Sequence, residues 1–140
     1  MMPPVVLDAS TALTFVLHDE RDAGAESMLA SMRATPAVVP AIWRPEVLSG
    51  LLNARRRRRI DDAGIGEALE IFDCLQIEVD ADPPAFATLH ALATTHALTP
   101  YDACYLELAQ RRQLRLATGD SDLIRAAKQS GVALHAVPTP

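Results

Sequence analysis

Near its N-terminus the chain reads Val5-Val6-Leu7-Asp8-Ala9-Ser10-Thr11-Ala12-Leu13, and this stretch decides the fold class. Three consecutive apolar residues are typical of a short strand that is covered on both faces, as in a parallel sheet. The pattern changes at Asp8. Ser10 or Thr11 can cap a helix, and the apolar residues that follow fit one helical face: Ala12, Leu13, Phe15, Val16 and Leu17. The stretch therefore predicts a strand, an acidic residue and then a helix.

The same alternation continues along the chain. Further strands are predicted over residues 37–40, 76–80, 114–117 and 132–137. Helices are predicted over about 23–33, from 45 to the arginine run at 55–59, from 61, from 83, from 99, and from 119 to a stop at Gly131. The helix that opens at 61 is expected to turn Ile65, Leu69 and Phe72 inward. This order predicts a three-layer α/β/α fold, with helices on both faces of a mostly parallel central sheet.

Length and composition restrict the class of protein. The 140 residues predict a single domain over 1–140, and 49% apolar with 22% charged residues excludes a disordered chain. No apolar run approaches the roughly 20 residues that span a bilayer, so no membrane role is expected. The first residues lack the features of a signal peptide, and Cys74 and Cys104 are expected to be reduced thiols in the core. We therefore expect a cytoplasmic protein.

Four acidic residues occupy positions where a parallel sheet places its sites. Asp8 follows the first predicted strand and Asp120 follows the strand at 114–117, while Glu46 and Asp102 lie in first turns of helices. Each of them has an alternative role in capping or stabilising a helix start. Together at one edge they would repel one another unless a cation lay among them, and such oxygen ligands suit Mg²⁺ or Mn²⁺. A bound metal can activate water and neutralise phosphate oxygens during phosphodiester hydrolysis.

Four segments of the chain resemble, in order, the acidic motifs of the PIN-domain family. They are Val5-Val6-Leu7-Asp8-Ala9-Ser10, then Pro45-Glu46-Val47, then Thr99-Pro100-Tyr101-Asp102-Ala103-Cys104-Tyr105-Leu106-Glu107-Leu108-Ala109, and finally Leu116-Ala117-Thr118-Gly119-Asp120-Ser121-Asp122-Leu123. The third match is the most specific. At this length the chain is most similar to the VapC-type toxin ribonucleases of that family.

The resemblance implies a magnesium-dependent endoribonuclease, the toxin component of a type II toxin–antitoxin system, neutralised by a VapB-type antitoxin and forming a homodimer. It assigns the catalytic acids to Asp8, Glu46, Asp102 and Asp120. Asp8 and Asp102 are expected to contact the metal directly, with Glu46 and Asp120 acting through water or completing the shell. Whether Asp122 or Thr118 joins the site stays open.

Two other functions remain as alternatives. A phosphatase-like α/β enzyme would use Asp8 as a covalent nucleophile, although Ser10 stands where such enzymes often carry a second acid. A non-catalytic module would use the acids to hold a metal or a partner, or only to cap helices. The run Arg55 to Arg59 holds five of the 13 basic residues in a chain of net charge −5. It has three possible roles: a solvated helix end, a contact for RNA phosphates, or a docking point for an acidic stretch of an antitoxin.

Overall fold

The computed structural model describes residues 2–136 and contains a four-stranded sheet in which every pairing is parallel. The strands are β1 (Val5–Leu7), β2 (Ala37–Val39), β3 (Ile77–Val79) and β4 (Arg115–Ala117), in the spatial order β3-β2-β1-β4. The register sets Val6 beside Val38 on one side and beside Leu116 on the other. All three residues of β1 are fully buried, as expected for the central strand of a parallel sheet.

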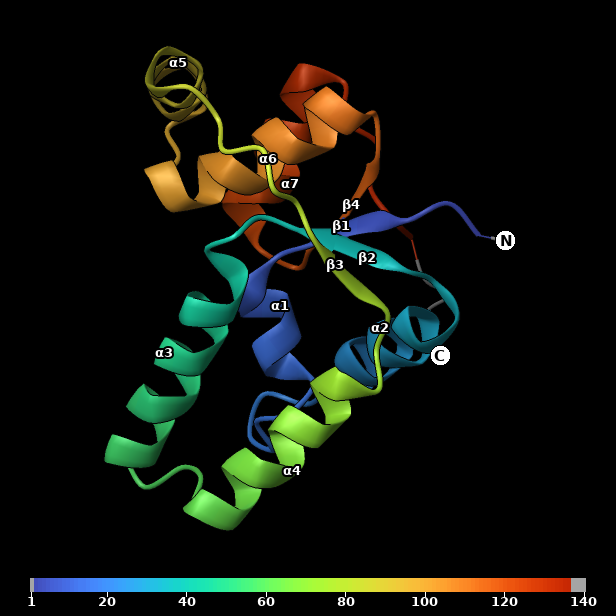
Figure 1. The fold of residues 1–140 in the computed structure, drawn as a ribbon, viewed down its shortest axis with the longest axis vertical. Coiled ribbons are helices and arrows are strands. Elements are labelled where there is room, and N and C mark those ends of the chain that lie inside the picture. The colour runs from blue at the N-terminus through green and yellow to red at the C-terminus, as the bar shows by residue number, and fades with distance from the viewer. Residues whose placement is uncertain (1, 137–140) are drawn as a thin grey trace.

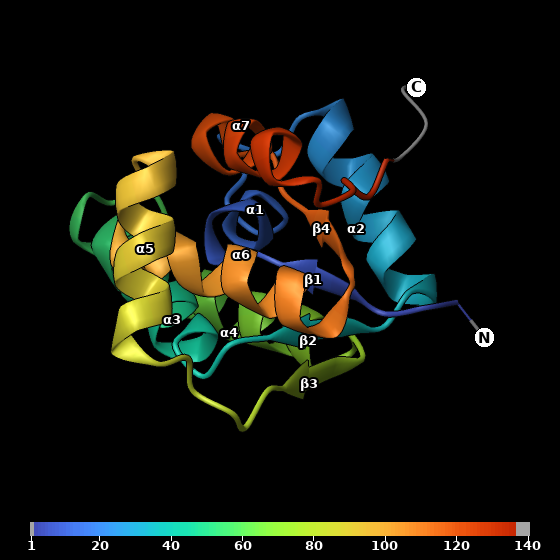
Figure 2. The same ribbon diagram turned by 90° about the horizontal axis from the view of Figure 1, so that it is seen from above.

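Seven helices connect and cover these strands: α1 (Ala9–Thr14), α2 (Ala23–Ala34), α3 (Trp43–Arg56), α4 (Asp62–Asp73), α5 (Phe86–His96), α6 (Pro100–Arg112) and α7 (Ser121–Ser130). Figure 1 shows α5, α6 and α7 above the sheet in that view, with α1, α3 and α4 below it. Helix α6 packs on β1 and β4, and α5 packs on α6 at the outside of the molecule (Figure 2). The predicted three-layer α/β/α fold is confirmed.

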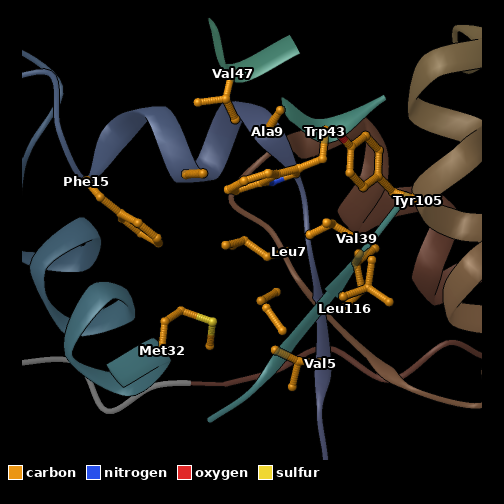
Figure 3. Packing of buried hydrophobic residues seen from close by; sticks show 14 of the residues in the cluster. Val5, Leu7, Ala9, Phe15, Met32, Val39, Trp43, Val47, Tyr105 and Leu116 are labelled. Carbon is orange, nitrogen blue, oxygen red and sulfur yellow. The ribbon is translucent and has the colours of Figure 1, made fainter. Parts of the chain in front are cut away.

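One apolar cluster fills the space between the sheet and both layers of helices (Figure 3). Val5 and Leu7 contribute from β1, Leu116 from β4, and Trp43 and Val47 from α3. Burying a side chain of this size stabilises the fold by about 1.5–3 kcal/mol. This packing holds the ends of the strands, and the residues that follow them, in fixed positions.

Three details of the predicted elements are wrong. The first helix ends at Thr14 rather than near residue 17, although Phe15 and Leu17 are still buried. Leu69 on α4 is exposed, because Ala68 takes its place beside the predicted Phe72 on the inward face of that helix. The last predicted strand, 132–137, is reduced to a single parallel bridge between Leu134 and Leu116 in the described part of the chain; residue 137 lies outside it.

The cysteines also differ from expectation. Cys74 is exposed, because it follows the last turn of α4 on the solvent side, and it is therefore not a core thiol. Cys104 on α6 is half-buried, and burial raises the pKa of its thiol above the usual range. In residues 2–136 no helix combines the length and the apolar character that a membrane crossing requires.

Candidate functional site

The carboxyl ends of the parallel strands meet at one edge of the sheet, and the chain places acidic residues there. Asp8 directly follows β1, and Asp120 follows β4 after Thr118 and Gly119. Glu46 lies in the first turn of α3, the helix that follows β2. Asp102 lies in the first turn of α6, whose N-cap Thr99 accepts a hydrogen bond from the Asp102 backbone N–H.

Asp8 is the most buried of these acids, with only 2% of its surface exposed. It is the N-cap of α1: Oδ1 accepts from the Thr11 backbone N–H at 3.3 Å, and Oδ2 accepts from the Ser10 hydroxyl at 2.7 Å. Burial raises the pKa of Asp8, because a charged carboxylate is disfavoured away from water, and the bonds from Thr11 and Ser10 only partly oppose this. The site therefore holds an acidic group in an environment that penalises its charge.

The charge of Asp102 on α6 acts on Glu46 on α3. Burial is the largest cause that raises the pKa of Glu46, and the negative charge of Asp102 raises this pKa further. Burial likewise raises the pKa of Asp102, with the charges of Asp120 and Asp122 adding to the shift. Like charges raise pKa values in this way only when they lie near one another. The structure thus links Glu46, Asp102 and Asp120 into one region of negative potential.

The turn between β4 and α7 fixes Asp120. The Asp120 backbone N–H donates to Thr118 Oγ1 at 3.0 Å, and the Gly119 N–H donates to Thr11 Oγ1 at 2.9 Å, which ties this turn to α1. Asp120 caps α7 by accepting from the Asp122 N–H. Asp122 itself is exposed and forms an ion pair with Arg125 at 2.8 Å.

A cleft of about 550 Å³ opens beside Asp120, the one of the four acids that lines it. It lies between α1, α2 and the start of α7, and its lining includes Ser10, Thr11, Glu20 and Asp120. Hydroxyl and carboxylate oxygens therefore face an open space next to Asp120. This cleft gives a ligand access to Asp120 from the α2 side.

Sequence reasoning missed one residue that contacts the acids, Tyr105. Its hydroxyl donates a hydrogen bond to Glu46 Oε1 at 2.6 Å. The available signal was its spacing, because residues three apart on a helix lie on the same face and Tyr105 follows Asp102 by three on α6. The partner on α3 is distant in sequence, so that spacing alone did not identify the bond.

The four acids suit a hard divalent cation in their chemistry, since they offer only oxygen ligands, and in residues 2–136 none of the four forms an ion pair with Lys, Arg or His. Their geometry limits the number of direct ligands. Within the same range, no three His, Cys, Asp or Glu side chains are placed to hold one metal ion together. Magnesium keeps several waters and usually takes only one or two carboxylates directly, so it does not require a cluster of three protein ligands.

The arginine run does not act as one unit. Arg55 pairs with Asp62 at 2.7 Å, and Arg59 pairs with Asp19 at 2.7 Å and with Glu20 at 3.4 Å. In the described residues Arg56 and Arg57 are exposed and form no ion pair. The run therefore combines two arginines that join neighbouring segments with others that face solvent at the end of α3.

The sequence profile of the PIN domain matches residues 5–129, and the chain belongs to the PIN-domain family. PIN domains are generally metal-dependent nucleases, which agrees in kind with an edge of carboxylates beside a cleft. The crystal structure of PAE2754 from Pyrobaculum aerophilum is similar in fold, with a TM-score of 0.67 over 90% of this chain and 87% of that one, at 20% sequence identity. No curated protein matches the sequence.

Proposed function

We propose that this protein is a magnesium-dependent endoribonuclease that serves as the toxin of a type II toxin–antitoxin system, with Asp8, Glu46, Asp102 and Asp120 as its catalytic acids. The observation that carries the proposal is the buried Asp8 at the end of β1 together with the effect of the Asp102 charge on Glu46 and of the Asp120 charge on Asp102. The PIN-domain match supports the nuclease class.

Asp8 and Asp102 are the residues that would hold the metal. When bound, Mg²⁺ would supply an acidified water and neutralise charge on the phosphate; Mn²⁺ has the same ligand preference. Thr11 and Ser10 fix the plane of the Asp8 carboxylate through the two bonds to its oxygens, while each oxygen keeps a further lone pair. The site therefore holds Asp8 in one orientation without using all of its acceptor capacity.

Glu46 acts as the proton acceptor in this proposal. Its Oε1 is occupied by the Tyr105 hydroxyl, which leaves Oε2 to take a proton from the attacking water. A raised pKa suits this role, because a general base works best when its pKa lies near the working pH. Asp120, held by the β4–α7 turn, orients water or completes the shell.

Arg56 and Arg57 extend the proposed RNA surface along α3. Arg56 lies about 15 Å from Glu46 along the helix axis, at a rise of roughly 1.5 Å per residue, and both arginines are exposed. Their charge would favour RNA phosphates on a chain whose net charge of −5 otherwise repels them. A VapB-type antitoxin would neutralise the enzyme, and the active form would be a homodimer.

The test is cleavage of total RNA by the purified chain with Mg²⁺, with excess chelator, and with two variants. Asp8→Asn should abolish cleavage, whereas Asp73→Asn, a matched change on the exposed end of α4, should leave it intact. Mapped cleavage ends would name the target RNA. Full activity of Asp8→Asn, or activity that survives the chelator, would refute the proposal.

The toxin role needs its own assay in cells. Induction of the chain should arrest growth, induction of Asp8→Asn should not, and co-expression of the antitoxin should restore growth. RNA cleavage in vitro without growth arrest in cells would support the proposed nuclease activity and refute the proposed toxin role.

The non-catalytic alternative has one specific observation in its favour, since Asp8 and Asp120 do cap α1 and α7. If the acids served only as caps or held a metal for stability, calorimetry with Mg²⁺ would show either no binding or binding without cleavage. A phosphatase-like role would instead yield a phosphoenzyme at Asp8, which the near-complete burial of that residue disfavours.

A further inference from the structure

Tyr105 is a polar residue in an apolar setting. It is 1% exposed and reaches from α6 into the cluster of buried residues that also contains Leu7, Ala9 and Trp43 (Figure 3). A phenylalanine would fill nearly the same volume without a hydroxyl that must find a partner away from water. The hydroxyl finds its partner in Glu46, at 2.6 Å.

The hydroxyl also lies where three segments of the site meet. It bonds to Glu46 on α3, it belongs to the same buried cluster as Ala9 at the start of α1, and the charge of Asp8 contributes to raising its pKa. Burial, together with these negative neighbours, raises the pKa of Tyr105 far above its usual range, so the phenol stays protonated and remains a donor at any working pH.

Without this bond the Glu46 carboxylate would move away from the other acids. Its long side chain is only half-buried at the start of α3, and the negative charge of Asp102 opposes it. A free glutamate in that position would relieve the repulsion by rotating toward water. The Tyr105 hydroxyl counters this with a charge-assisted hydrogen bond, which is stronger than a neutral one.

We propose that Tyr105 is the positioning residue that holds the Glu46 carboxylate among the acids of the site. The inference rests on the proposed function for its consequence in catalysis, but the positioning itself is a property of the fold. Tyr105 acts through Glu46 and has no contact with RNA. Its loss therefore affects the chemical step and leaves substrate binding unchanged.

The test is Tyr105→Phe, which removes only the hydroxyl. It should lower kcat by roughly tenfold or more, the effect of losing one hydrogen bond to a charged group, with KM for RNA unchanged. Tyr101→Phe is the matched control, because Tyr101 lies on the same helix with an exposed side chain, and it should not alter kcat. Thermal unfolding of both variants shows whether the fold is retained.

Measuring the effect of Tyr105→Phe in a second variant, Glu46→Asp, separates positioning of Glu46 from general support of the core. In Glu46→Asp the shorter side chain loses the reach to Tyr105, so adding Tyr105→Phe should cause no further loss of kcat. If Tyr105 only supported the core, Tyr105→Phe would reduce kcat by the same factor in the unaltered chain and in Glu46→Asp. Equal losses in the two backgrounds would overturn the inference. So would an unchanged kcat in Tyr105→Phe if Glu46→Gln is inactive. Either result would leave the proposed function standing.

A titration keeps the inference testable without nuclease activity. The Glu46 carboxyl carbon, followed by NMR against pH, should titrate at lower pH in Tyr105→Phe, because a carboxylate that has rotated into water leaves the burial and the Asp102 charge that raise its pKa. Titration at higher pH would mean that the carboxylate stays in place without the bond, and would overturn the positioning role. If the unaltered chain cleaves no RNA, the proposed function fails, while this titration still decides whether Tyr105 holds Glu46. An identical Glu46 titration in both proteins would overturn the positioning role.

Discussion

Replacing Arg111 with methionine should destabilise the protein far more than the same change at its neighbour Arg112. Arg111, in the last turn of α6, bonds Asp80 at 2.6 Å and Glu107 at 2.7 Å. It also donates to the Asp82 carbonyl at 3.2 Å, which fastens the crossover between β3 and α5 to α6. Methionine keeps an apolar stem of similar length and removes the charge together with all three contacts.

The magnitude follows from the burial of the partners. The side chains of Asp80 and Glu107 are only 8% and 9% exposed. Removing Arg111 leaves Glu107 without its cation and leaves Asp80 with Arg112 alone, at 3.7 Å. Breaking a fully buried pair costs about 3–5 kcal/mol. Because Arg111 itself is 33% exposed and water can reach the gap, we expect about 2–3 kcal/mol. For a chain of this size that corresponds to a fall in Tm of roughly 6–10 °C.

Arg112→Met is the matched control. Arg112 bonds Glu78 at 2.6 Å, but the Glu78 side chain is 62% exposed, and such surface pairs contribute only about 0–1 kcal/mol. Its second pair, with Asp80, is longer at 3.7 Å, and in Arg112→Met the shorter bond from Arg111 to Asp80 at 2.6 Å remains. The assay is urea unfolding of the two variants and the unaltered chain at pH 7. Equal losses in the two variants would refute the argument from burial.

The pH dependence gives a second check on Arg111. Its guanidinium holds the pKa of Asp80 below the ordinary value of 3.8, so the stability from this pair is present above that value and is lost as pH falls through the lower folded pKa. The difference between Arg111→Met and the unaltered chain should therefore be full at pH 7 and should shrink below about pH 4. A difference that stays constant down to acid pH would show that lost packing, and not lost charge pairing, causes the effect.

Three further predictions concern the acidic site and the end of α3. Without metal at pH 7, Asp8→Asn should raise Tm by about 3 °C or more, because burial raises the pKa of Asp8 and the neutral amide still caps α1; in differential scanning calorimetry the gain should vanish as pH falls toward 3.8, and a lower Tm at pH 7 would contradict this. Magnesium at a hundredfold excess over its Kd should stabilise the unaltered chain by about 2.7 kcal/mol and Asp8→Asn much less; equal stabilisation of both would place the ion elsewhere. Replacing Arg56 and Arg57 with glutamine should reduce the slope of log K for RNA binding against log salt by about 1.5 without altering Tm, and an unchanged slope would remove these residues from the RNA surface.

The fold could be predicted from the sequence because its determinants are local. The apolar run at 5–7, the proline in the first turn of α3 and Thr99-Pro100 at the start of α6 each specify an element through nearby residues. Gly131 ends α7 with φ of +76°, as its position predicted. Interleaved strands and helices then leave few arrangements besides a parallel sheet covered on both faces.

The errors come from features that local patterns do not determine. Leu69 and Ala68 are adjacent on α4, and only the packing of that helix against the rest of the fold decides which of them faces inward. The chain after α7 carries enough apolar residues for a strand, but in the described residues it pairs only through Leu134. A strand forms when a neighbour offers a continuous ladder, and that information is not local.

The candidate site was predictable in its residue types and not in its internal contacts. Strand ends identify Asp8 and Asp120, since a parallel topology sends them to one edge. The bond between Tyr105 and Glu46 joins residues 59 apart in the chain. The division of the arginine run is equally non-local, because the partner of Arg59 is Asp19, 40 residues away. Such contacts depend on how the helices pack, which composition and spacing do not reveal.

The capping and functional explanations of Asp8 predict different residues at that position. As an N-cap, asparagine serves about as well as aspartate, and it would avoid burying a charge whose pKa is raised by desolvation. Selection for stability alone would therefore favour asparagine at the end of β1. The aspartate is explained when something other than the helix needs its charge, as the proposed divalent cation shared with Asp102 would. The stability of Asp8→Asn without metal is the measurement on which this reasoning depends, because a stabilised, inactive variant is the pattern of a residue retained for function at the expense of the fold.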